Sequence, residues 1–234
     1  MFDEQLPFND GGTAASFKPS YEKKPYQNWN KDKSSSGGNT NWQKKPWGGN
    51  KPKDEFIGLY QAYVGTGNKD TPDNIISTFK RIAEELENLG YIARTGGMDG
   101  PDNVFEAVKN VELHLPWKGF NNKDSKFTFN SDNAKHIAKM FHTSFDTLKP
   151  AIQAMLAKNA RLVLGKDLKS PAMFVICWSA DGAETKLEKT ASTGNVGHVI
   201  AIANAMRIPV FNFGKRDAES RLKNFLGIPY VKES

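Results

Sequence analysis

The fold of this chain is decided by one stretch, Phe56-Ile-Gly-Leu-Tyr-Gln-Ala-Tyr-Val-Gly-Thr-Gly-Asn-Lys-Asp-Thr-Pro72. Its first half, Phe56 to Val64, is apolar and aromatic and predicts a buried strand. A turn of small and polar residues follows, and apolar residues then recur at helical spacing from Pro72 to Leu89. We expect Asp70 or Thr71 to cap this helix and Gly90 to end it. A strand, a glycine-rich turn and a helix in this order are typical of a parallel α/β sheet.

The same alternation continues along the rest of the chain. We expect strands at 91–94, 111–115, 172–178 and 209–213, and helices at 101–109, 131–142, 145–158, 197–206 and 218–226. The strand at 172–178 is continuously apolar, which indicates burial on both faces of a sheet. Residues 54–234 are therefore predicted to form a Rossmann-like, doubly wound α/β domain, a mostly parallel sheet with helices on both faces.

Composition excludes several classes of protein. The single cysteine, Cys177, lies in an apolar run and is expected to be a core residue, so a disulfide within the chain is excluded. Four scattered histidines and one cysteine predict no metal site. No apolar stretch approaches the roughly 20 residues of a membrane span, and the N-terminus is acidic where a secretory signal is basic. We expect a cytoplasmic protein that does not enter membranes.

The first 53 residues differ from the rest. They contain no Val or Ile and carry nine Lys against five acids, which is +4 of the net charge of +6. Such a segment cannot bury enough apolar surface to fold alone, so residues 1–53 are predicted to be a disordered arm. Its aromatic residues are Phe2, Phe8, Phe17, Tyr21, Tyr26, Trp29, Trp42 and Trp47. Rings that stack on bases, with lysines that neutralise phosphates, favour single-stranded nucleic acid as a partner; protein docking and a solubilising tail are the alternatives.

The extreme N-terminus has a second pattern. Gln5, Leu6 and Phe8 resemble the Gln-Leu peptides that dock into bacterial sliding clamps. The acidic residues before them and the Pro-Phe pair are also similar to the C-terminal tip of bacterial single-strand binding proteins. The resemblance implies a sliding clamp or another replication protein as a partner.

Three loops between predicted strands and helices are rich in Gly, Ser, Thr and Asn. They are Gly65 to Pro72, Thr95 to Asp102, and Ser192 to Gly197. The loops that follow parallel strands gather at the carboxyl edge of the sheet, where the N-termini of helices present free N–H groups. We expect the three loops to form one donor-rich site for phosphate at this edge.

These loops carry a resemblance to a known family. Gly65-Thr-Gly-Asn68 with Thr71-Pro72 resembles the first turn of DprA/Smf-like proteins of the SLOG superfamily, and Thr95-Gly-Gly-Met-Asp-Gly-Pro-Asp102 is similar to their Ser-Gly-Gly loop. Ala191-Ser-Thr-Gly-Asn-Val-Gly-His198, followed by Ile208-Pro-Val-Phe-Asn212, resembles their late glycine-rich turn and strand. The resemblance implies a site for a nucleotide or for single-stranded DNA. Small isolated domains of this kind with a polar arm are also similar to bacteriophage proteins, which would place the chain in the host cytoplasm.

The resemblance also implies the binding residues. They are Gly65, Thr66, Gly67, Asn68, Gly96, Gly97, Asp99, Ser192, Thr193, Gly194 and Asn195. Asn68 stands where the family has an arginine, so Lys69 or Arg94 is expected to supply the positive charge. From the sequence itself, Trp117 is a candidate for stacking on a base and His198 for a ligand contact. Lys158-Asn-Ala-Arg161 resembles an Arg-Asn element of DprA-like proteins, which implies that Asn159 and Arg161 lie near the floor of the site.

Two other functions stay open beside binding of nucleotides or single-stranded DNA in DNA processing, recombination or replication. One is cleavage of an N-glycosidic bond. The family's hydrolases have a Glu in their late turn that is missing from 193–200, so Asp102, Glu106 and Asp181 are the candidate acids. The other is a sensor or sequestering protein for nucleotides. No cofactor is predicted beyond the nucleotide ligand. Phe225 and residues 228–231 suit either a homo-oligomer contact or the core of a monomer.

Overall fold

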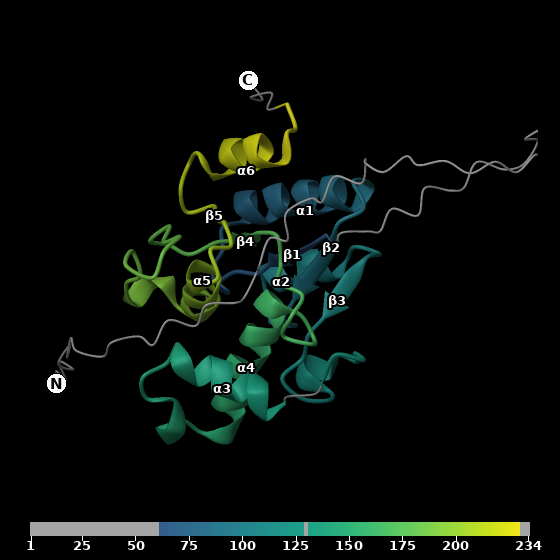
Figure 1. Cartoon of the computed structure of the whole chain (residues 1–234). Helices are drawn as coiled ribbons and strands as arrows, with labels where there is room; N and C mark the ends of the chain where they lie inside the picture. Colours follow the sequence, from purple (N-terminus) through teal and green to yellow (C-terminus); the bar gives the residue numbers. More distant parts are fainter. Residues whose placement is uncertain (1–60, 129–130, 230–234) are drawn as a thin grey trace, which may run out of the picture. The chain divides into compact units, whose positions relative to one another are not determined.

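The computed structural model describes residues 61–128 and 131–229. At its centre lies a five-stranded, all-parallel sheet with the order β3-β2-β1-β4-β5 (Figure 1). The strands are β1 (Ala62–Gly65), β2 (Ile92–Thr95), β3 (Val111–Leu113), β4 (Val175–Cys177) and β5 (Val210–Asn212). Val64 of β1 pairs with Arg94 of β2 on one side and with Val175 of β4 on the other. The predicted Rossmann-like α/β fold is confirmed, and its strand order reverses between β1 and β4.

Six α-helices and three short 3₁₀ helices are found in the described part of the chain. The α-helices are α1 (Asp73–Asn88), α2 (Pro101–Glu106), α3 (Asp132–Met140), α4 (Pro150–Leu164), α5 (Val196–Ala205) and α6 (Ala218–Leu226). The 3₁₀ helices are η1 (Phe120–Asn122), η2 (Phe145–Thr147) and η3 (Ala191–Thr193). The predictions on residues 1–60, on 129–130 and on 230–234 lie outside the described residues.

The sheet is covered on both faces because its side chains alternate between two apolar cores. Tyr63, Ile176 and Phe211 point to the core that holds buried residues of α1, α2 and α6. Their neighbours Val64 and Val175 point to the opposite core, which holds buried residues of α4 and α5. Figure 1 shows α1 and α6 on one side of the sheet and α4 on the other, where α3 packs against α4. The doubly wound architecture is therefore present.

The start of α1 corrects one prediction. Neither Asp70 nor Thr71 caps the helix, because Pro72 is the N-cap residue and makes no side-chain cap. The Thr71 hydroxyl instead donates to the carbonyl oxygen of Asn68 at 2.6 Å and closes the first loop. The predicted end is confirmed: Gly90 has φ +83°, and Tyr91 N–H donates to the carbonyl oxygen of Leu86.

The region between β3 and β4 also differs from the sequence prediction. A helix at 145–158 was expected, but Phe145–Thr147 is a 3₁₀ turn and α4 begins at Pro150. A proline at the first helical position has no N–H to lose, so it favours this start. The helix then runs to Leu164 and includes Lys158, Asn159 and Arg161. Over the described ranges, none of the helices combines the length and the apolar character needed to cross a membrane.

Candidate ligand-binding site

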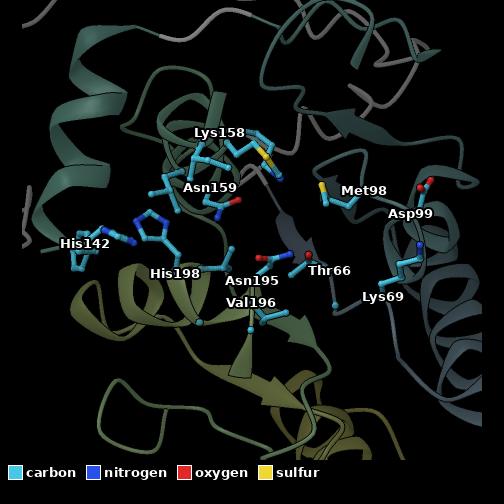
Figure 2. Close-up of a pocket in the computed structure, with 18 of the residues that line it drawn as sticks. Thr66, Lys69, Met98, Asp99, His142, Lys158, Asn159, Asn195, Val196 and His198 are labelled. Atoms are coloured by element: carbon cyan, nitrogen blue, oxygen red, sulfur yellow. The ribbon is translucent and has the colours of Figure 1, made fainter. Parts of the chain in front are cut away.

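A cavity of about 670 Å³ opens beside the carboxyl ends of β1 and β4 (Figure 2). All three small-residue loops contribute to its lining, through Thr66, Gly67 and Lys69, through Met98 and Asp99, and through Gly194 and Asn195. The loops therefore meet at one edge of the sheet, as expected. Ligands of open α/β sheets bind where the strand order reverses, and the volume is in the range of small-molecule sites.

The helices α4 and α5 and the residues just after α3 provide the other walls. Apolar side chains of Phe141, Ile152, Met155 and Leu156 form one part of the lining. Lys158, Asn159 and His198 contribute polar groups to the same lining (Figure 2). The cavity thus combines an apolar wall with a polar floor.

Asp102 holds the first two loops together. It lies in the first turn of α2 and is fully buried. Its carboxylate accepts a hydrogen bond from the Thr66 hydroxyl at 2.9 Å and from the backbone amides of Gly96 and Met98, both at 3.1 Å. Burial raises the pKa of Asp102, although the positive charge of Lys158 and these hydrogen bonds act in the opposite direction. The residue predicted as a candidate acid is thus engaged by three donors that shape the loops.

Asn68 joins the first loop to the third. Its amide nitrogen donates to the carbonyl oxygen of Thr193 at 3.0 Å. Gly194, with φ +58°, lies against the same side chain, and a Cβ there would come within 2.9 Å of the Asn68 amide oxygen. Asn68 therefore connects two of the loops that line the cavity.

Asp181 holds the third loop in place through hydrogen bonds with Thr190 and Thr193. Its carboxylate accepts hydrogen bonds from the hydroxyls of Ser179, Thr190 and Thr193 and from the amide of Ala183. Burial acts to raise the pKa of Asp181, but the hydrogen bonds from Thr193, Ser179 and Thr190 outweigh it and keep the pKa well below its usual value. Asp181 is not among the residues that line the cavity.

The N-terminus of α5 faces the cavity without a cap. Asn195, the N-cap residue, makes no side-chain hydrogen bond to the helix, and Val196 and Gly197 line the cavity beside it. The backbone amides of Gly67, Asn195 and Val196 have no acceptor within the described ranges. Free N–H groups at the positive end of a helix are a suitable site for an anion.

Lys158 is the buried cation of the site. It is 4% exposed, lines the cavity, and points toward it from α4 (Figure 2). Its amine lies directly over Gly96, where a Cβ would come within 2.2 Å of Nζ. Burial lowers the pKa of Lys158, and the nearby Asp102 carboxylate opposes this fall. Among the residues that the structure describes, its amine has no hydrogen-bond acceptor.

Several predicted residues lie near the cavity but not on its surface. Gly65, Gly96, Gly97, Ser192 and Thr193 belong to the loops without lining the cavity. A Cβ on Gly65 would come within 2.3 Å of the Phe105 ring and one on Gly97 within 2.5 Å of Leu115, so close packing accounts for both glycines. Trp117 is 40% exposed and contacts Phe120 edge-on, and it is Phe120 that lines the cavity.

Arg94 and Glu106 form ion pairs outside the cavity lining. Arg94 is 1% exposed, forms a 2.8 Å ion pair with Glu112 and donates to the carbonyl oxygen of Ser170. Glu106 forms a 2.8 Å ion pair with Lys123. Burial raises the pKa of Glu106, and Lys123 opposes the rise. The structure brings neither residue to the lining of the cavity.

Sequence reasoning did not place Lys158 or the apolar side chains in the lining of the cavity. Asn159 lines the cavity as expected, whereas Arg161 is buried and does not reach it. The signal that could have found Lys158 is a lone lysine in the apolar half of a helix, since α4 is buried from Ala157 to Leu164. A buried lysine without a neighbouring acid in sequence often belongs to a site.

Comparison of the chain with models of protein families, with curated proteins and with solved structures found no match. The fold and the geometry of the cavity therefore carry the functional argument.

Proposed function

We propose that this chain binds a nucleotide in the cavity between β1 and β4, with a phosphate at the N-terminus of α5. The observation that carries the proposal is the buried side chain of Lys158, for which no ion pair is found among the described residues, beside a helix N-terminus with free amides. The charge of Lys158 acts on the Asp102 carboxylate, which already accepts three hydrogen bonds. Burial removes the hydration of this cation, and a bound anion would offset more of that cost than Asp102 alone. Phosphate is the anion that helix N-termini and lysines bind together in α/β proteins.

The rest of the cavity favours a nucleotide over free phosphate. Its volume of about 670 Å³ is far larger than a phosphate ion needs. The apolar wall of Phe141, Ile152, Met155 and Leu156 gives a base a surface to pack against. The resemblance of the three loops to DprA-like proteins supports the same ligand class and a role in DNA processing.

Calorimetry with AMP, ADP, cyclic AMP and adenosine tests the proposal. We expect AMP or ADP to bind and adenosine, which lacks the phosphate, to bind far more weakly. Lys69 lies exposed at the rim beside Asp99 (Figure 2), so Lys69→Ala should weaken binding by only about threefold, and less at high salt. Lys80→Ala, an exposed lysine on α1 away from the cavity, is the matched control and should not change affinity. Equal binding of AMP and adenosine would contradict the proposal.

Single-stranded DNA is the second candidate ligand, and the composition of residues 1–53 favours it. Their nine lysines and eight aromatic residues suit interactions with phosphates and unpaired bases. Removal of residues 1–53 is expected to weaken binding of oligothymidine and to flatten its dependence on salt, by about 0.7 in slope for each phosphate that is no longer neutralised. Affinity for AMP, measured on the same variant, should stay unchanged. An unchanged affinity and salt slope for oligothymidine would reject the role of the arm.

A further inference from the structure

The end of the cavity next to α3 contains a histidine with one ring nitrogen in use and one free. His198 is 7% exposed and lines the cavity. Its Nε2 lies 3.1 Å from the carbonyl oxygen of Ala138, in the last turns of α3. Its Nδ1 is buried and has no hydrogen-bond partner in the described part of the chain.

The hydrogen bond to Ala138 determines which ring nitrogen carries the proton. A carbonyl oxygen can only accept, so Nε2 must be the N–H donor. Burial is the main cause that lowers the pKa of His198, to about 4, and the charges of His142, Lys189 and Lys158 act in the same direction. The ring is therefore neutral near pH 7, and Nδ1 is an acceptor. Buried acceptors nearly always have a partner, so one that no protein group fills, on a residue that lines a cavity, is available to a donor on a ligand.

A fully ionised phosphate has no N–H or O–H to donate, so a donor to Nδ1 belongs to the nucleoside part of the ligand, although the charges of Lys189 and Lys158 also act on His198. Phe141 packs edge-on against the imidazole, with ring centroids 6.5 Å apart. Ile152, Met155 and Leu156 add apolar surface to the lining of the same cavity. Figure 2 shows His198 and His142 on one side of Thr66 and Asn195, and Lys69 with Asp99 on the other. A ligand whose phosphate rests on the N-terminus of α5 can therefore extend toward His198.

We propose that Nδ1 of His198 accepts a hydrogen bond from the nucleoside part of the bound nucleotide, either from an amino group of the base or from a ribose hydroxyl. This inference rests on the proposed function, because it assigns the other end of the same ligand. It makes His198 a residue that determines specificity. A nucleotide without the donor leaves the buried acceptor unpaired and binds more weakly.

Two substitutions of His198 test the contributions of the two ring nitrogens separately. In His198→Gln the amide nitrogen reaches about as far as Nε2, so the bond to Ala138 is kept while the acceptor at the Nδ1 position is lost. In His198→Asn the amide oxygen takes the place of Nδ1, so an acceptor is kept while the bond to Ala138 is lost. A purely structural histidine predicts that stability changes and that the choice between ligands does not.

The experiment compares pairs of ligands that differ by one donor. The pairs are AMP with purine riboside 5′-monophosphate, GMP with IMP, and AMP with its 2′-deoxy and 3′-deoxy forms. We expect the parent protein to prefer the donor-bearing member of at least one pair by roughly tenfold. The pair that discriminates identifies the donor as base or ribose. His198→Gln should abolish this preference with little change in melting temperature. His198→Asn should keep part of the preference but have a lower melting temperature than the parent.

The outcomes separate this inference from the proposed function. If the parent binds AMP but discriminates within no pair, or if His198→Gln keeps the full preference, the inference is overturned and the nucleotide site stands. If the parent binds no nucleotide, both are overturned. A preference lost in His198→Gln and kept in His198→Asn supports both.

Discussion

Replacement of Lys158 with methionine is expected to lower affinity for AMP by about 100-fold, which is the size of effect that one lost charge-assisted hydrogen bond to a buried phosphate produces. Methionine keeps the length of the apolar stem and removes only the charge. The loops that line the cavity should keep their places, because Asp102 retains its bonds to Thr66, Gly96 and Met98. Calorimetry with AMP measures the loss, and Lys80→Met is the matched control on an exposed face.

The same substitution should leave the domain at least as stable as the parent. The pKa of Lys158 is lowered in the folded state, mainly by burial. A lysine of this kind disfavours folding at every pH below its unfolded value near 10.5, and the penalty fades as pH rises from the folded pKa toward that value. Urea unfolding at neutral pH should therefore give Lys158→Met an equal or higher free energy of unfolding. A loss of stability would mean that Asp102 depends on the lysine charge.

The pH dependence of binding should follow from the same group. Only the protonated amine of Lys158 attracts a phosphate, so the affinity of the parent for AMP is expected to fall as pH rises through the lowered pKa. Binding raises that pKa again and should take up a proton, which calorimetry in buffers of different ionisation enthalpy detects. Lys158→Met should lose this component. Affinity equal to that of the parent in Lys158→Met would contradict the proposed phosphate position.

The sequence predicted the layered part of the fold because its signals are local. A continuously apolar run marks β4, and apolar residues at helical spacing mark α1, whichever partners they later contact. The end of α1 at Gly90 was also predictable, since a positive φ after a helix favours glycine. The strand order is less local, yet alternating strands and helices leave few arrangements for a parallel sheet.

The cavity was only partly predictable, because its key contacts join residues far apart in the chain. The three loops could be recognised from their composition and placed at one edge by the rule for parallel strands. Lys158 was harder to place, because the helix expected at 145–158 would have ended there, whereas α4 continues to Leu164 and is buried from Ala157 onward. Arg94 was expected in the site, but its partner Glu112 on the neighbouring strand becomes apparent only when β2 and β3 are paired.

Asp102→Ala is the second substitution with a large expected effect. It leaves three donors, the Thr66 hydroxyl and the amides of Gly96 and Met98, without their shared acceptor. Since hydrogen bonds to a buried charged group are worth more than neutral ones, the free energy of unfolding should fall by about 3 kcal/mol or more. The first two loops should lose their arrangement as well, so AMP binding should disappear.

Asp102→Asn should be far milder, and this contrast tests what the carboxylate does. The asparagine oxygen can accept from both amides while its nitrogen donates to Thr66, whose hydroxyl is free to rotate. Because burial already raises the pKa of Asp102, a neutral group is well tolerated there. We expect most of the stability and AMP affinity to remain in Asp102→Asn, with Asp70→Asn, an exposed residue outside the cavity lining, as the control. If Asp102→Asn is as unstable as Asp102→Ala, the negative charge itself holds the loops through Lys158. If it binds AMP but loses a base-releasing activity that the parent shows, Asp102 acts as an acid in an enzyme.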